Sequence, residues 1–223
     1  MTLPLQFQSN AKKKCVFCEP APELILLTTD HFLLMFDPFA LVPGHLLIAS
    51  REHYGCLGEV PLELQNEVNT LRELAYTYLE KAFKEQITRY EHGRAGHCLM
   101  QDPTSRLCHH YHEHLIPKRI SLNDFLIPNF KYIPYESEHE LCDLFLRYNE
   151  YLLVAEPGFE KRFYIAKDKK IEPHLLRTLS AESIGYPERQ NWESYESCEL
   201  MLLGKQILAP LIQNEHLNAE LSK

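Results

Sequence analysis

The segment His110-Tyr111-His112-Glu113-His114-Leu115-Ile116-Pro117 places three histidines at alternate positions and ends at a proline. Alternate side chains of a β-strand point to one face, so this spacing predicts a strand with its imidazoles in a row. Histidine titrates near neutral pH and its two ring nitrogens differ. Neighbouring histidines can therefore supply a nucleophile, a hydrogen-bond donor to an oxyanion and a metal ligand. The alternative interpretation is a polar strand with surface histidines.

The composition predicts a protein with a substantial core. The chain has 223 residues, 45% of them hydrophobic, a net charge of −8 and a pI of about 5.8. It has no basic stripe, so neither a nucleic acid nor a membrane is expected as a partner. No apolar run reaches membrane-spanning length, and the first 14 residues lack the apolar centre of a signal peptide. The seven cysteines do not fit a secreted disulfide framework, so we expect a cytoplasmic protein.

The first half of the chain alternates short apolar runs with one long amphipathic stretch. Leu24–Thr28 and His31–Phe36 predict a hairpin, and His45–Ala49 predicts a third strand. Pro61 opens a helix whose apolar residues recur at steps of three and four, and Gln86–Tyr90 predicts a further strand. This order predicts an α+β fold in which a long helix covers one face of an antiparallel sheet, leaving the opposite face for a site.

The second half is expected to be more helical. Ser137 fits a capping box at the start of a helix, and Pro173 starts another short helix. Two strands are predicted at Tyr151–Ala155 and Arg162–Ala166, and a last helix at Ser194–Ala209, stopped by Pro210. We predict three parts: a flexible N-terminus at 1–13, a core at 14–120, and a C-terminal extension at 121–223 that packs on the core.

Cys15 and Cys18 form a C-x-x-C pair, which can fold around one ion. A redox dithiol of thioredoxin type would open a helix after a strand, whereas this pair precedes the first predicted strand. Two more ligands are needed for zinc, and His53 together with one histidine of the alternating set are candidates. The alternative is a reduced pair without metal.

Taken together, these motifs resemble the histidine triad (HIT) superfamily of nucleotide hydrolases and transferases, whose signature is matched by residues 110–116. Phe36–His45 resembles the family's nucleoside-binding segment. A narrower resemblance is to zinc-bearing bacterial HIT-like hydrolases with a C-terminal extension, carried by Glu91-His92-Gly93, Gly185-Tyr186-Pro187 and Trp192. The resemblance implies a HIT-like antiparallel sheet with a long helix on one face, plus a smaller helical and β-hairpin extension.

The resemblance also implies hydrolysis at the α-phosphate of an adenosine or other nucleoside polyphosphate, or of a phosphoramidate. His112 would form a nucleotidyl-histidine intermediate, and His114 would hydrogen-bond the phosphoryl oxygens. Asp37 would bind ribose, Phe39 or Leu41 would flank the base, and His45 would lie near the phosphates. An AMP-containing nucleotide is the expected substrate, and no organic cofactor is implied.

In zinc-bearing relatives the first triad histidine completes the metal site, so the implied ligands of a structural zinc are Cys15, Cys18, His53 and His110. Family members often form homodimers, which makes a homodimer the implied assembly here.

Two departures from the family pattern motivate other interpretations. Glu113 should point toward the helix layer, where it needs a partner such as Arg119 or His109, unless the strand is exposed. The usual Gly-Gln-Ser/Thr stretch is not recognisable in Ser105–Cys108. One alternative is therefore a non-catalytic, zinc-stabilised nucleotide-binding module. Another is nucleotidyl transfer to phosphate or a sugar phosphate, although relatives of that kind often replace the third histidine, which is retained here as His114.

Overall fold

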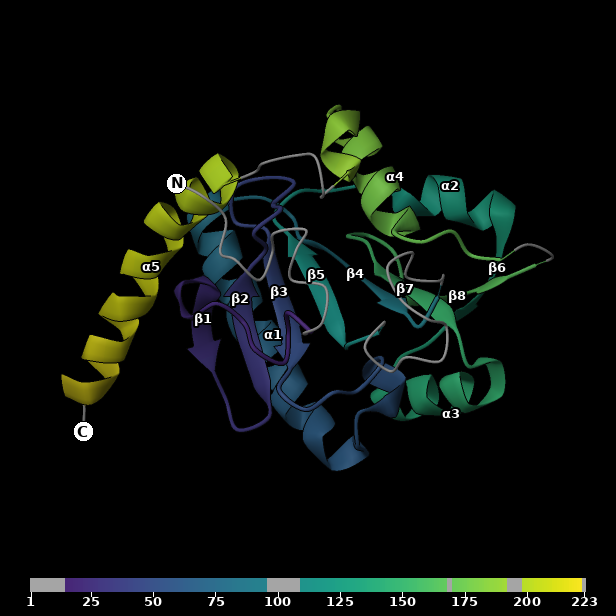
Figure 1. Ribbon diagram of the computed structural model, residues 1–223, viewed down its shortest axis with the longest axis horizontal. Helices are drawn as coiled ribbons and strands as arrows, with labels where there is room; N and C mark the ends of the chain where they lie inside the picture. The colour runs from purple at the N-terminus through teal and green to yellow at the C-terminus, as the bar shows by residue number, and fades with distance from the viewer. Residues whose placement is uncertain (1–14, 96–108, 168–169, 192–197, 222–223) are drawn as a thin grey trace.

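A computed structural model describes residues 15–95, 109–167, 170–191 and 198–221. Within this part of the chain, eight strands form one antiparallel sheet in the order β1-β2-β3-β5-β4-β7-β8-β6 (Figure 1). The strands are β1 (Ile25–Thr28), β2 (Phe32–Phe36), β3 (Leu46–Ser50), β4 (Thr88–Gly93), β5 (His112–Ile116), β6 (Phe130–Pro134), β7 (Tyr151–Ala155) and β8 (Arg162–Ala166). The α+β architecture predicted from the sequence is confirmed.

Some of the sequence predictions fall on residues outside the described ranges. These are the flexible N-terminus at 1–13, the segment Ser105–Cys108 before the triad, and Trp192. They stay predictions.

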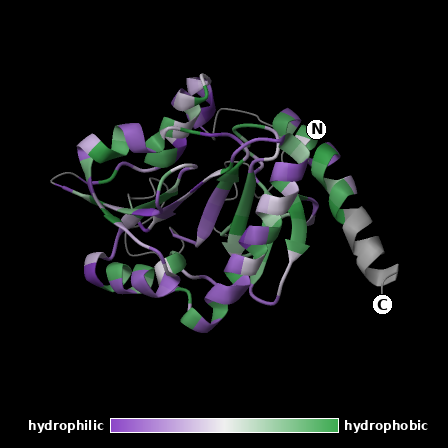
Figure 2. Cartoon of the chain, turned by 180° about the vertical axis from the view of Figure 1, so that it is seen from behind, coloured by the Kyte–Doolittle hydropathy of each residue, from purple (hydrophilic) through white to green (hydrophobic). Residues whose placement is uncertain are grey.

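The first half of the chain follows its sequence pattern closely. β1 and β2 form the expected hairpin, and β3 pairs with β2 on one side and with β5 on the other. Helix α1 (Leu62–Phe83) begins directly after Pro61, where a missing N–H costs no helical hydrogen bond. Figure 2 shows α1 crossing in front of the mainly hydrophobic central strands. This helix confirms the layer predicted from its three- and four-residue periodicity.

The second half of the chain extends the same sheet. β7 pairs with β4 over five residue pairs, β8 pairs with β7, and β6 pairs with β8. The helices that accompany these strands are α2 (Leu122–Asn129), α3 (Glu138–Tyr148), α4 (Leu175–Ser183) and α5 (Cys198–Leu221), with short 3₁₀ turns at Pro22–Leu24, Leu57–Glu59 and Pro187–Gln190. The capping box predicted at Ser137 is present, because its side chain accepts the backbone N–H of Glu140 and the Glu140 side chain returns to the backbone of Ser137.

Helices cover both faces of the sheet. One buried cluster joins α1 and α5 to the sheet, whereas a second cluster lies under α2 and α4. The second cluster contains Tyr90, Leu152, Val154 and Tyr164, which alternate along β4, β7 and β8 with residues of the other face. The expectation that the face opposite α1 is left free is therefore wrong near β4 and β7, because apolar residues there need cover.

Helix α5 continues past Pro210 to Leu221, so the predicted stop at that proline is wrong. A proline inside a helix removes one hydrogen bond to the carbonyl four residues earlier. That carbonyl belongs to the exposed Gln206, where water can replace the missing donor. Further back, Gly204 lies against the turn at Gly44, since a Cβ on Gly204 would come within 2.5 Å of the Gly44 backbone nitrogen.

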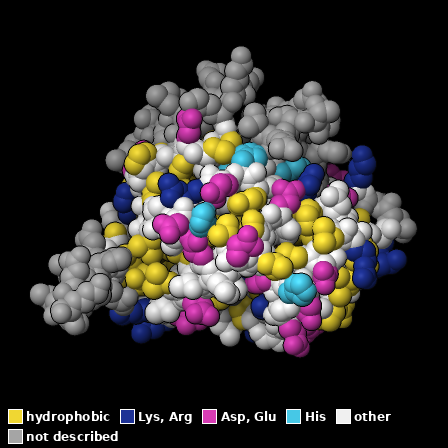
Figure 3. All heavy atoms as spheres, turned by 90° about the horizontal axis from the view of Figure 1, so that it is seen from below, with side chains coloured by type: hydrophobic (Ala, Val, Ile, Leu, Met, Phe, Trp, Pro, Cys, Tyr) yellow, Lys and Arg dark blue, Asp and Glu magenta, His cyan; other side chains and the backbone are white. Residues whose placement is uncertain are grey.

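No described helix has both the length and the apolar character needed to cross a membrane. The face in Figure 3 mixes acidic, histidine and hydrophobic side chains, with Lys and Arg mainly toward its edges.

Candidate active site

β5 lies between β3 and β4 and carries two of the three triad histidines on one face. His112 is opposite Ala49 of β3, and His114 is opposite Leu47 of β3 and Tyr90 of β4. The two imidazole centroids are 5.1 Å apart. His110 is separated from the start of β5 by Tyr111, and its ring is directed toward Cys15.

Two aromatic rings hold these imidazoles in place. Phe17 stacks on His112 with centroids 4.5 Å apart and an angle of 21°, and Tyr90 stacks on His114 at 4.5 Å and 22°. Sequence reasoning did not single out either aromatic residue. Phe17 lies within the C-x-x-C segment. The expected folding of that segment around a metal was the one sequence signal that could have placed Phe17 near the triad.

The hydrogen bonds of His112 define its tautomer. Its Nδ1 lies 2.8 Å from the carbonyl oxygen of His110, which can only accept. Nδ1 therefore carries the proton, and Nε2 keeps a lone pair. Burial lowers the pKa of His112, so the ring is neutral at pH 7. A neutral imidazole with a free Nε2 is the form that can act as a nucleophile.

A second chain of contacts defines the tautomers of His45 and His114. The backbone N–H of Leu41 donates to His45 Nδ1 at 3.1 Å, so the proton of His45 lies on Nε2. That N–H donates to His114 Nδ1 at 2.9 Å, which leaves an N–H on His114 Nε2. Burial lowers the pKa of His45 to about 4 and that of His114 well below its usual value. His114 is thus a neutral donor beside His112.

Asp37 stands at the end of β2, beside this histidine pair. One carboxylate oxygen accepts the backbone N–H of Phe39 at 2.7 Å, and the other is 3.4 Å from His45 Nδ1. The same second oxygen is 3.5 Å from Nη1 of Arg177, which comes from α4. Asp37 is only 3% exposed. The structure thus brings Asp37 and His45 together with His114, whereas Phe39 lies half-buried on the adjacent loop.

Two arginines of the C-terminal segment hold the loop that carries these residues. Arg177 donates to the Phe39 carbonyl at 2.6 Å, and Arg189 donates to the Leu41 carbonyl at 2.6 Å. Arg177 also donates to the carbonyls of Arg189 and Gln190. Sequence reasoning could not find this contact, because about 140 residues separate the arginine from the carboxylate it faces.

The four predicted metal ligands lie together. Cys15, Cys18, His53 and His110 each offer one ligand atom, and these atoms all lie within 4.8 Å of one another. The closest contacts are 3.1 Å between Cys18 Sγ and His53 Nδ1, and 3.1 Å between the Nδ1 atoms of His53 and His110. Cys15 Sγ is 3.3 Å from His110 Nδ1.

The geometry and chemistry of this cluster fit zinc. Zinc bonds of about 2.3 Å to sulfur and about 2.0 Å to nitrogen put tetrahedral ligand atoms roughly 3.3–3.8 Å apart. The Nε2 of His110 donates to the carbonyl of Ser50 at 2.7 Å, which leaves the Nδ1 lone pair directed at the thiols. Without a cation, burial and the neighbouring Cys15 raise the pKa of Cys18 to about 11. A divalent cation is what would hold these thiols as thiolates.

Glu113 points from β5 to the opposite face of the sheet. Its carboxylate accepts hydrogen bonds from Arg72 of α1 at 2.8 and 3.0 Å and from Arg89 of β4 at 2.8 Å. These partners replace Arg119 and His109, which the sequence suggested. Burial alone would raise the pKa of Glu113, but the two guanidinium groups outweigh it and hold the pKa at about 2.

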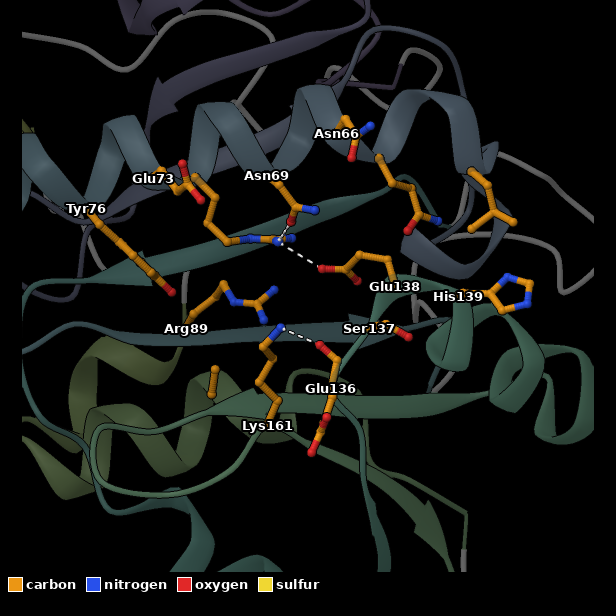
Figure 4. A pocket seen from close by; sticks show the side chains of 14 residues that line it. Asn66, Asn69, Glu73, Tyr76, Arg89, Glu136, Ser137, Glu138, His139 and Lys161 are labelled. Carbon is orange, nitrogen blue, oxygen red and sulfur yellow. Dashed lines mark hydrogen bonds and ion pairs between the residues drawn. The ribbon is translucent and has the colours of Figure 1, made fainter.

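A cavity of about 700 Å³, lined mostly by polar and charged residues, opens on this opposite face between α1, β4 and the start of α3 (Figure 4). Arg72 and Arg89 line it, and Glu138 pairs with Arg72 at 3.1 Å. Since Arg89 and Glu113 share this face, the sheet separates the cavity from His112 and His114.

Comparison with known proteins finds a family match in the part of the chain that holds the triad. The HIT domain family model matches residues 19–120. The match covers a little under half of the chain. The match spans β1 to β5 and includes the triad histidines, Asp37 and His45. No curated protein matches the chain.

Several solved structures are similar to this chain at low sequence identity. A Hit-like protein from Bartonella henselae is 18% identical, with 46% of this chain and 71% of that chain covered and a TM-score of 0.37. A hypothetical histidine triad nucleotide-binding protein from Sulfolobus tokodaii is 22% identical, with coverages of 47% and 68% and a TM-score of 0.38. Yeast Ap4A phosphorylase in complex with AMP is 17% identical, with coverages of 91% and 81% and a TM-score of 0.43.

Proposed function

We propose that this HIT-domain protein is a hydrolase that cleaves a nucleoside polyphosphate or phosphoramidate at its α-phosphate through a nucleotidyl-histidine on His112. The observation that supports this most directly is the 2.8 Å contact between His112 Nδ1 and the His110 carbonyl. It leaves the lone pair of Nε2 available for attack on phosphorus. An adenosine nucleotide is the substrate that the sequence resemblance favours.

The reaction has two displacements. In the first, Nε2 of His112 forms a bond to the α-phosphorus while the bond from that phosphorus to the leaving oxygen or nitrogen breaks. The leaving group takes up a proton as it departs. In the second, water attacks the phosphorus, the P–N bond breaks, and the nucleoside monophosphate is released. Covalent catalysis of this kind replaces one difficult step by two easier ones.

His114 and His45 are proposed to stabilise the negative charge on the phosphoryl oxygens. The 2.9 Å contact between them leaves the Nε2–H of His114 as a donor, which we assign to a phosphoryl oxygen. His45 then acts through His114. Asp37 and Phe39 are assigned to the nucleoside, and a ribose hydroxyl would share Asp37 with Arg177.

A zinc ion held by Cys15, Cys18, His53 and His110 is proposed as a structural element. When bound, it would neutralise the thiolates and fix the segment before β5. His110 connects the two sites, because its Nδ1 faces the thiols while its carbonyl orients His112. Metal analysis of native protein should find about one zinc per chain, and Cys15→Ser should lower it sharply. Native protein without metal would contradict this assignment.

Turnover is tested with a diadenosine polyphosphate and with an adenosine phosphoramidate, with release of AMP as the readout. His112→Ala should abolish release, whereas the matched variant His31→Ala, on the β1–β2 turn, should retain it. A nucleotide labelled on the α-phosphate should leave acid-labile label on wild-type protein only. Unchanged turnover in His112→Ala would exclude the nucleophile.

The same assay separates the other functions. If added phosphate diverts the product from AMP to ADP, the protein is a nucleotidyltransferase. If AMP binds in calorimetry but no substrate turns over, it is a binding module and the hydrolase proposal fails. The homodimer expected from the sequence resemblance is checked by light scattering.

A further inference from the structure

The nucleotide loop contains an electrostatic conflict at His45. Its Nδ1 accepts the backbone N–H of Leu41 at 3.1 Å but also lies 3.4 Å from a carboxylate oxygen of Asp37. The N–H of Leu41 favours the tautomer with the proton on Nε2. The carboxylate favours the opposite tautomer, or the imidazolium, because in either form Nδ1–H could donate a hydrogen bond to it.

The two tautomers have different consequences for His114. With the proton of His45 on Nε2, His114 accepts at Nδ1 and keeps a donor at Nε2. With the proton on Nδ1 of His45, the 2.9 Å contact must run in reverse, so His114 would donate from Nδ1 and present a lone pair at Nε2. A lone pair repels a phosphoryl oxygen. The position of one proton on His45 therefore decides whether His114 can stabilise an oxyanion.

Arg177 is placed to resolve this conflict. Its Nη1 lies 3.5 Å from the oxygen of Asp37 that faces His45. Both residues are buried, with Arg177 6% exposed and Asp37 3% exposed. Charges buried this deeply are little screened by solvent. The other charged or titratable groups that influence His45 are His112 and His114, both neutral in this arrangement.

We propose that Arg177 is a positioning residue that keeps the proton of His45 on Nε2 by neutralising Asp37, and so keeps His114 a donor. The C-terminal segment thereby controls a histidine of the HIT domain through a residue outside the matched region 19–120. The statement about His114 as a catalytic donor depends on the proposed function, whereas the statement about the tautomer of His45 does not.

Arg189 provides a matched control within the same segment. It donates to the Leu41 carbonyl at 2.6 Å, so its loss loosens the same loop while Arg177 keeps its contact with Asp37. Arg177→Lys keeps the positive charge. Arg177→Met removes both the charge and the donors, and Arg177→Gln keeps a donor for the Phe39 carbonyl if the methionine variant does not fold.

The test is long-range ¹H–¹⁵N NMR of the imidazoles, which distinguishes a protonated Nδ1 from a protonated Nε2. At pH 7, wild type, Arg177→Lys and Arg189→Met should show His45 protonated on Nε2. Arg177→Met or Arg177→Gln should shift the population to Nδ1–H or imidazolium, and Asp37→Asn added to either should restore the wild-type signature. The proposal is overturned if the signature survives loss of Arg177, or if Arg189→Met changes it equally.

Kinetics add an independent measurement. Arg177→Met should lower kcat about tenfold or more with a smaller change in KM, since a donor used in the transition state is lost. If no nucleotide is turned over by wild type, the proposed function fails, but the NMR result still decides the role of Arg177.

Discussion

Replacing Glu113 by glutamine should destabilise the protein by about 3 kcal/mol at pH 7. The pKa of this carboxylate falls from its ordinary 4.5 to about 2 in the fold, and each pH unit corresponds to about 1.36 kcal/mol. This value agrees with the cost of losing one member of a buried ion pair, which is about 3–5 kcal/mol. The amide of glutamine would turn one N–H₂ group toward Arg72 or Arg89, both of which can only donate.

The pH dependence has a definite sign. Because the folded pKa of Glu113 lies below the unfolded value, its stabilisation is complete above about pH 4.5 and is lost as the pH falls through about 2. The free energies of unfolding of wild type and Glu113→Gln should therefore differ most at pH 7 and approach each other as the pH falls. Urea unfolding at pH 7 and pH 3 measures both differences.

A matched control is Glu85→Gln, at an exposed glutamate after α1. Its effect on the free energy of unfolding should be below about 0.5 kcal/mol at either pH. The reasoning is refuted if Glu113→Gln lies within about 1 kcal/mol of wild type at pH 7, or if its deficit is the same at pH 3.

Two further variants test packing and burial elsewhere. Gly204→Ala should lower the melting temperature, because its Cβ would come within 2.5 Å of the Gly44 nitrogen; an unchanged thermal melt by circular dichroism would contradict that contact. Burial raises the pKa of Glu91 to about 8, so the stability associated with its protonated form is complete below about pH 4.5 and lost as the pH rises through about 8. The free energy of unfolding of Glu91→Gln should therefore rise relative to that of wild type between pH 5 and pH 8, as measured by urea unfolding. A difference between the two proteins that does not change with pH would exclude this.

Local patterns predicted most of the individual elements. The hairpin, α1 after Pro61 and the capping box at Ser137 depend on neighbouring residues, and each was correct. The candidate metal ligands and the pair Asp37 and His45 were implied by the family resemblance, and the structure brings each set together.

Contacts between distant segments could not be predicted in this way. Glu113 clearly needed a partner, but nothing in the spacing indicated Arg72 and Arg89, which come from α1 and β4. For Arg177, nothing in the spacing indicated Asp37 as its partner, because the two residues lie 140 positions apart. Pro210 shows the opposite failure: a strong local rule was outweighed where the lost hydrogen bond is exposed to water.

The pairing of β4 with β7 determines where this protein can be truncated. A fragment ending at residue 120 would contain the whole HIT match but would leave one edge of β4 without its neighbour. The apolar surface around Tyr90 and Ile116 would lose its cover at the same time. An unpaired strand edge beside an exposed apolar surface can pair with other copies of the chain, so such a fragment is expected to aggregate during expression. In this protein, we therefore expect that the end of the family match at residue 120 is not a boundary of independent folding.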